Sequence, residues 1–204
     1  MLPDNSSVID IGANIGIMTV HFAKKLRNSV VYAVEPVSEN MKALERIIMF
    51  YRLKNVKTIK SALGDQNGEI EMVLPIIKSV KMQGLSHVLH PQIEGYENGD
   101  RFKVCVQKLD DLFLDKISEK PLKAIKIDVE NYEYFVLLGA KELLKRYHPY
   151  LYMELWDNDN REKCFKLLAE IGYRTKVIHK GKLIDFDKST RKTQNFFFLP
   201  PEKS

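Results

Sequence analysis

Glycines and polar residues with a regular spacing follow the first apolar run of the sequence. Asp10, Gly12, Asn14 and Gly16 form the pattern D-x-G-x-N-x-G, and Val8 and Ile9 precede it. The glycines allow a positive φ and a close approach of a ligand to the backbone, and Asn14 is expected to cap the helix that follows. An acid inside this turn suits a ligand with a positive centre or free hydroxyls better than a pyrophosphate, which binds bare backbone amides.

A second acid follows the next apolar run. Val30–Val34 predicts a buried strand that ends in Glu35-Pro36, and Glu35 comes 23 residues after Gly12. In nucleotide-binding α/β sheets an acid at this place accepts hydrogen bonds from ribose hydroxyls. We therefore expect both carboxylate oxygens of Glu35 to bind a ribose. S-adenosylmethionine, which has a sulfonium, an ammonium and a ribose, fits both turns.

Four predicted strands end in an acid, namely Asp10, Glu35, Asp128 and Glu154. Each acid alone is often only the cap of the next helix. Because the carboxyl ends of parallel strands share one sheet edge, we expect the four carboxylates to converge, which indicates a cationic or hydroxyl-rich ligand.

Several groups near this edge are candidates for a general base, which would remove the proton of a weakly nucleophilic acceptor. The candidates are Asp128, Glu130, Glu133 and His87. Glu133 is equally well explained as a first-turn acid that complements a helix dipole. His87 and the nearby His90 are better explained as exposed loop residues.

The elements that position these residues alternate between strand and helix. Helices are expected at about 15–27, 38–51, 109–112, 132–146 and 160–171, the second of them capped by Ser38. Strands are expected at 8–11, 30–34, 56–62, 123–128, 150–155, 173–179 and 194–199. The β-α-β order predicts a parallel sheet with right-handed crossovers. The lysines that flank the 123–128 strand indicate that one of its faces is less well covered.

Between residues 69 and 107 the pattern changes to two strands, 69–74 and 101–106, joined by a stretch without a clear period. We expect a hairpin-like excursion that covers the substrate, within a single domain of residues 1–204.

Composition excludes several classes of protein. The 204 residues are 45% hydrophobic and carry a net charge of +5, with the basic residues spread out rather than in a dense run, so no nucleic-acid partner is expected. No apolar run is long enough to span a bilayer. Cys105 and Cys164 match no metal or redox spacing and are expected in the core of a cytoplasmic protein. The amino terminus shows no signal region, and no substrate-covering extension is expected before the first strand.

Several segments carry a resemblance to a known family. They are Val8–Gly16, Ala33–Pro36, Ala62–Asp65, Lys108–Leu112, Ile125–Glu130, Glu133, Leu138–Ala140, Pro149, Glu154 and Asn195–Phe198. Together they resemble, over essentially the whole chain, the FkbM family of class I S-adenosylmethionine-dependent methyltransferases. One departure is Asn131, where the family usually has glycine. Asparagine tolerates a left-handed backbone, but its side chain would narrow a pocket at this turn.

The resemblance implies a Rossmann-like α/β fold with a seven-stranded, mostly parallel sheet, an antiparallel last strand and helices on both faces. It also implies methylation of a hydroxyl on a sugar, glycan or other small molecule. At the methionine end of the cofactor, the resemblance implies Gly12, Asn14 and Gly16, with Asp10 orienting their loop. It implies Glu35 at the ribose and, at the adenine, Ser61, Ala62 and Leu63. Asp128 is implied to face the methionine and the acceptor.

Two other interpretations of the function remain open. One is a dehydrogenase on the same type of sheet, against which the turn spacing and Asp10 argue. The other is a binding module that keeps the fold without turnover. A divalent metal held by Asp128, Glu154 and Asp157 is not demanded by any tight ligand spacing, and no metal is predicted.

Overall fold

The computed structural model describes residues 4–77, 80–81, 86–91, 98–115, 120–188 and 193–201. Its larger sheet has eight strands. In spatial order they are β12 (Lys182–Asp185), β11 (Arg174–His179), β13 (Asn195–Leu199), β10 (Tyr150–Glu154), β9 (Leu122–Ile127), β1 (Ser7–Ile11), β2 (Val30–Val34) and β3 (Val56–Ile59).

The five strands from β10 to β3 are parallel, and β13 runs antiparallel to both β10 and β11. The expected Rossmann-like arrangement with an antiparallel last strand is therefore confirmed. The expected strand number of seven is wrong, because β12 adds an eighth strand at the edge. Lys180 and Gly181 have φ values of 48° and 76°, which close a two-residue hairpin between β11 and β12.

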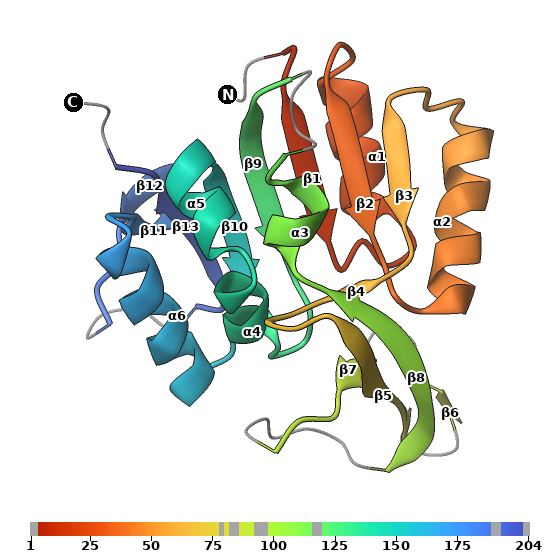
Figure 1. Ribbon diagram of the computed structural model, residues 1–204. Coiled ribbons are helices and arrows are strands. Elements are labelled where there is room, and N and C mark those ends of the chain that lie inside the picture. The colour runs from red at the N-terminus through yellow and green to blue at the C-terminus, as the bar shows by residue number, and fades with distance from the viewer. Residues whose placement is uncertain are drawn as a thin grey trace.

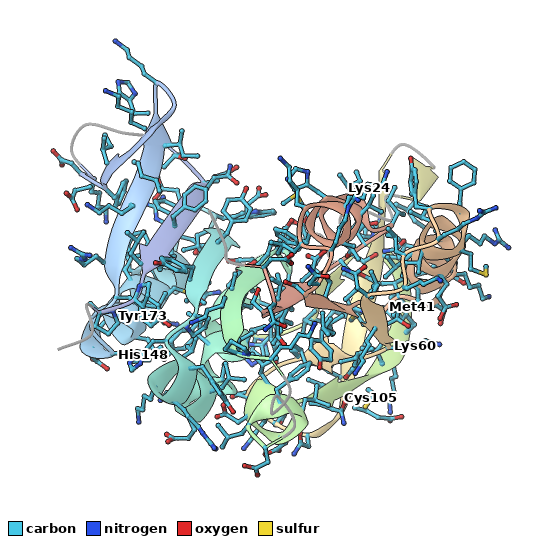
Figure 2. All side chains as sticks on the ribbon, turned by 90° about the horizontal axis from the view of Figure 1, so that it is seen from above. Lys24, Met41, Lys60, Cys105, His148 and Tyr173 are labelled. Carbon is cyan, nitrogen blue, oxygen red and sulfur yellow. The ribbon has the colours of Figure 1, made fainter. Side chains whose placement is uncertain are left out.

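Helices cover both faces of this sheet. Their bounds are α1 (Ile17–Lys25), α2 (Ser38–Phe50), α3 (Leu109–Phe113), α4 (Glu133–Leu138), α5 (Lys141–Tyr147) and α6 (Asp159–Glu170). α1 and α2 lie on one face and the other four helices on the opposite face (Figures 1 and 2). Among the described residues, no helix has the length and apolar character needed to cross a bilayer.

A second, smaller sheet forms between residues 62 and 107. Its strands are β4 (Ala62–Leu63), β5 (Gly68–Ile77), β6 (Val80–Lys81), β7 (His87–Val88) and β8 (Gly99–Gln107). β5 and β8 form a long antiparallel pair, so the expected β excursion is confirmed. It lies at the bottom of Figure 1, beyond the carboxyl ends of the parallel strands.

The third expected strand is divided between the two sheets. The sequence predicts one strand over 56–62, but β3 ends at Ile59 and β4 pairs with β8. Ser61 stands at the crossing, where its Oγ donates to the carbonyl of Cys105 at 3.2 Å. Only two residues, Lys60 and Ser61, connect the strands of the two sheets here.

Four expectations about helix ends and burial are wrong. Asn14 and Ser38 cap no helix: α1 begins after Gly16 and α2 after Val37, neither with a side-chain cap. The expected helix over 132–146 is interrupted at Gly139-Ala140, where the carbonyl of Gly139 accepts from the amide of Asp110 at 2.9 Å rather than from the next helical turn. Gly139 also packs closely, since a Cβ there would lie 1.9 Å from the carbonyl oxygen of Gly64. Cys164 is buried as expected, but Cys105 on β8 is exposed (Figure 2).

Candidate functional site

The glycine turn after β1 is packed against the end of the neighbouring strand. Gly12 has a φ of 70°, and a Cβ at this position would lie 1.8 Å from the carbonyl oxygen of Asp128. Only glycine allows this approach. Gly16 has a φ of 97° and faces Leu44 of α2, where a Cβ would lie 2.4 Å from Cδ1. Gly16 therefore serves the packing of α2 and is not part of the cavity wall described below.

Glu35, at the end of β2, holds the glycine turn and the start of α2 together. Its Oε2 accepts from the amide of Asn14 at 2.9 Å, and its Oε1 accepts from the amide of Val37 at 2.9 Å and from Nδ2 of Asn40 at 3.2 Å. Burial raises the pKa of Glu35, and these three hydrogen bonds together with the charge of Lys126 oppose that rise. The carboxylate is thus fixed in one orientation at the wall of the cavity.

Lys126 is a buried ammonium beneath the glycine turn. Its Nζ lies 3.3 Å from Oδ1 of Asp10 and 3.3 Å from Oδ2 of Asp128, and it donates to the carbonyl of Gly12 at 2.9 Å. The expectation that lysines mark a poorly covered face of this strand is wrong for Lys126, which is 5% exposed. A lysine is almost never buried without such partners.

Asp10 is fully buried and does not line the cavity. Besides the contact with Lys126, its Oδ2 accepts from Oγ1 of Thr19 at 2.6 Å. Both contacts hold the turn between β1 and α1, so the structure places Asp10 under the loop rather than against a ligand.

The turn after β9 has an unusual backbone. Glu130 and Asn131 have φ values of 51° and 73°, a left-handed conformation that costs free energy for residues other than glycine and that clusters at functional sites. The carboxyl group of Glu133 holds this turn, because its Oε1 accepts from the amides of Val129 at 3.1 Å and Asn131 at 3.2 Å. Glu133 is itself buried and does not line the cavity.

Asn131 keeps the left-handed turn in place of the family's glycine without narrowing the cavity. Its Oδ1 accepts from Nδ2 of Asn158 at 2.7 Å, and its carbonyl accepts from Nδ2 of Asn160 at 3.3 Å. These contacts hold the side chain of Asn131 at the loop that follows β10, and Asn131 is not part of the cavity wall.

The carboxylates after β9 and β10 influence one another. Burial, helped by the charges of Asp128 and Glu154, raises the pKa of Glu130 to about 7. Burial and the charge of Asp128 also raise the pKa of Glu154. Glu130 consequently exchanges a proton near neutral pH, which is the property required of a general base.

A cavity of about 420 Å³ lies at the carboxyl ends of β1, β2 and β9, within the range typical of ligand sites. It brings together most of the cofactor and catalytic candidates. Of these, its wall contains Gly12, Asn14, Glu35, Ser61, Ala62, Leu63, Asp128 and Glu130. Glu154 lines it too, so three of the four convergent acids share the cavity, and Asp10 does not.

The second sheet supplies part of the same wall. Met72 of β5, Val88 of β7 and the adjacent Ser86 line the cavity. His87, between Ser86 and Val88, is buried rather than exposed as expected, and it lies outside the cavity wall. His90 packs against the rings of Phe135 and Tyr132, with centroid distances of 4.3 and 6.0 Å.

The described part of the chain contains no group of three His, Cys, Asp or Glu residues able to hold a metal ion. Asp157, named above with Asp128 and Glu154, is instead paired with Arg161 of α6.

Three residues of the site were missed as site residues at the sequence level: Lys126, Tyr132 and Asn40, all of which line the cavity. Lys126 is separated from Asp128 by one residue on a strand, which places both on one side, and this spacing was the available signal. Asn40 lies five residues after Glu35 and gives no signal of its own.

Comparisons with known proteins identify the family of the chain. The family model described as the methyltransferase FkbM domain matches residues 10–176. "Methyltransferase 1" of Beauveria bassiana (strain ARSEF 2860) is 23% identical over 150 residues, which are 69% of this chain and 60% of that protein.

Solved structures share the fold, and two of them illustrate the similarity. The FkbM methyltransferase of Methylobacillus flagellatus KT superposes with a TM-score of 0.63 at 16% identity, over 97% of this chain and 44% of that one. Aeropyrum pernix fibrillarin, in complex with S-adenosyl-L-methionine, superposes with a TM-score of 0.54 at 12% identity, over 96% of this chain and 66% of that one.

This chain thus spans 60% of the curated relative and 44% of the Methylobacillus structure. The family model covers most of the chain, and the glycine turn and the acids that follow β2 and β9 lie within the match. The chain belongs to the FkbM methyltransferase family.

Proposed function

We propose that this chain is an S-adenosylmethionine-dependent methyltransferase that acts on a hydroxyl of a sugar, a glycan or another small molecule. The observation that carries the proposal is one cavity that combines the fixed carboxylate of Glu35 with the carboxylates of Asp128 and Glu130. The carboxylate of Glu35 suits a ribose. We assign the carboxylates of Asp128 and Glu130 to the place where the sulfonium and the acceptor meet.

The residues present fit this cofactor. S-adenosylmethionine supplies an activated methyl group on a positively charged sulfur, so the protein has mainly to position the two reactants. Gly12 and Asn14 offer backbone to the methionine end, and Ala62 and Leu63 offer an apolar surface to the adenine. Asp128, whose side chain is 37% exposed, faces the cavity with one oxygen on Lys126.

Glu130 is the residue we assign as general base. It lines the cavity, and its pKa of about 7 allows it to take a proton from a hydroxyl at neutral pH. Glu133 acts through Glu130, since it holds the amides on both sides of that residue. The second sheet, through Met72, Ser86 and Val88, is proposed to cover the acceptor, with the whole chain acting as one domain.

The many acids in the cavity wall also favour a small-molecule acceptor and disfavour a nucleic acid. Four carboxylates line the cavity, those of Glu35, Asp128, Glu130 and Glu154, whereas Lys126 is the only Lys, Arg or His in the described wall. Because phosphates are repelled by such a surface, we propose an uncharged or cationic acceptor and no nucleic-acid partner.

Calorimetric titration with S-adenosylmethionine tests the cofactor assignment. Glu35→Ala is expected to weaken binding by roughly 2–3 kcal/mol, since it removes charged hydrogen bonds from a buried site. Glu39→Ala, which removes an exposed acid from the first turn of α2, is the matched control and should bind like the unaltered protein. Equal affinities for all three proteins would remove Glu35 from the site.

A turnover assay tests the catalytic assignment. Formation of S-adenosylhomocysteine is followed with a panel of sugars and glycans. We expect Glu130→Gln to bind the cofactor normally and to lose most of the turnover, because glutamine fills the same space without accepting a proton. Cofactor binding without turnover on any acceptor would instead favour a binding module.

A further inference from the structure

The hydrogen bonds of Glu35 leave little room for a second hydroxyl on its carboxylate. A carboxylate has about four lone-pair positions. Val37 and Asn40 already donate to Oε1, and Asn14 donates to Oε2. One position is left, on Oε2. A ribose presents two neighbouring hydroxyls, so the expectation that both oxygens of Glu35 accept from the ribose does not fit this arrangement.

Asn40 has the acceptor that the second hydroxyl needs. It lies in the first turn of α2, is 3% exposed and lines the cavity. Because a carboxylate can only accept, the amide nitrogen faces Glu35, and the amide oxygen is left for another partner. Among the described residues, Oδ1 of Asn40 has no hydrogen-bond partner. A buried polar oxygen in this state costs free energy unless a donor reaches it.

We propose that Asn40 is a second ribose ligand: one hydroxyl donates to Oε2 of Glu35 and the other to Oδ1 of Asn40. This assignment rests on the proposed function. Asn40 then has two tasks, since Nδ2 orients Glu35 and Oδ1 binds the ligand. The pair recognises both hydroxyls with separate atoms, so the site distinguishes a ribonucleoside from either deoxy form.

The test uses S-adenosylhomocysteine and its 2′-deoxy and 3′-deoxy analogues as calorimetric probes. Asn40→Leu keeps the size of the side chain and removes both polar atoms. We expect this substitution to lower the affinity for S-adenosylhomocysteine about tenfold, which corresponds to the loss of one buried hydrogen bond. For the analogue that lacks the hydroxyl bound by Asn40, we expect a smaller loss of affinity, because only the loss of the Nδ2 contact with Glu35 then remains. Ser38→Ala, a neighbouring change on the same turn, should leave all affinities unchanged.

A role through Glu35 alone would give a different result. Asn40→Leu would then weaken all three probes by the same factor, and that outcome, or no weakening at all, overturns the assignment. If the unaltered chain binds none of the probes, the proposed function fails and the assignment with it.

A crystal structure of the unaltered protein with S-adenosylhomocysteine decides the matter without any variant. Oδ1 of Asn40 within hydrogen-bond distance of one ribose hydroxyl supports the proposal. Both hydroxyls on the two oxygens of Glu35 overturn it.

Discussion

The ammonium of Lys126 joins three parts of the site that are distant in sequence. It contacts Asp10 on β1, the carbonyl of Gly12 in the glycine turn and Asp128 after β9. Its charge also lowers the pKa of Glu35, Glu130 and Glu154 against the effect of burial. One residue that need not touch the reacting atoms thus influences every acid of the cavity.

Removing Lys126 should destabilise the fold more than removing the whole ion pair. Lys126→Met leaves Asp10 buried with an uncompensated charge, and we expect a loss of roughly 3–5 kcal/mol in the free energy of unfolding. In the double variant Lys126→Met/Asp10→Asn most of that loss should be recovered. Urea denaturation of both variants, with Lys123→Met on the same strand as control, measures the difference. Additive losses in the double variant would show that the two groups do not depend on each other.

Glu133 makes stability depend on pH. Burial raises its pKa from 4.5 to about 8, so near neutral pH the folded chain holds a proton that the unfolded chain has released. The folded state is therefore favoured at low pH, and the stability from this proton is lost as pH rises towards 8. The free energy of unfolding should fall by up to about 1.4 kcal/mol per pH unit between pH 5 and 8.

Glu133→Gln should flatten this pH dependence, since glutamine stays uncharged. Denaturation at several pH values between 5 and 8 measures the slope. The control Glu142→Gln changes an exposed acid on α5 and should keep the slope of the unaltered protein. Glu130, with a pKa of about 7, contributes in the same direction, so some slope should persist. An unchanged slope in Glu133→Gln would mean that Glu133 is ionised in the folded state.

At the scale of elements, a side chain of one helix caps the start of another. Asp110 of α3 accepts from the amides of Glu142 at 3.1 Å and Leu143 at 2.8 Å, the first turn of α5, and its own amide donates to the carbonyl of Gly139 at 2.9 Å. Together with the close approach of Gly139 to Gly64, this explains why one expected helix becomes α4 and α5.

Asp110→Ala should lower the free energy of unfolding by about 1–2 kcal/mol, as for the loss of a helix cap. Asp111→Ala is the matched control, because Asp111 bonds only the exposed amide of Asn67 in the described contacts. We expect it to change stability by less than about 0.5 kcal/mol. Thermal or urea denaturation compares the two, and equal losses would argue against the capping role.

The sequence was sufficient for elements whose signal is local. The apolar runs before Asp10, Glu35, Asp128 and Glu154 all form strands of the sheet, because a buried strand needs little more than a short apolar segment between turns. The remaining features of the fold and the site depend on contacts between segments that are distant in the sequence. The burial of Lys126 depends on Asp10, and the end of β3 depends on the pairing of β4 with β8. Neither dependence is visible in a local pattern.

At the scale of the molecule, charge and topology separate the cavity from the rest of the surface. The chain carries a net charge of +5, yet its cavity wall is rich in acids. Apart from Lys126, the basic residues of the described part of the chain lie away from the cavity wall. Lys24 on α1 is an example, since its Nζ lies 3.6 Å from the ring centroid of Tyr51 (Figure 2). The cavity is also walled by both sheets, which meet where the chain crosses at Ser61.

If the whole chain works as one domain, S-adenosylhomocysteine should slow amide hydrogen exchange in both sheets. We expect protection at three places in the first sheet and its turns, Gly12–Asn14, Val37 and Val129–Asn131, and also at β5 and β7, because Met72 and Val88 line the same cavity. The hairpin of β11 and β12 lies at the opposite edge of the larger sheet and serves as the internal control. Mass spectrometry of peptides with and without the ligand measures the change. Protection confined to the first sheet would show that the second sheet takes no part in closing the site, and the proposed cover over the acceptor would have to be given up.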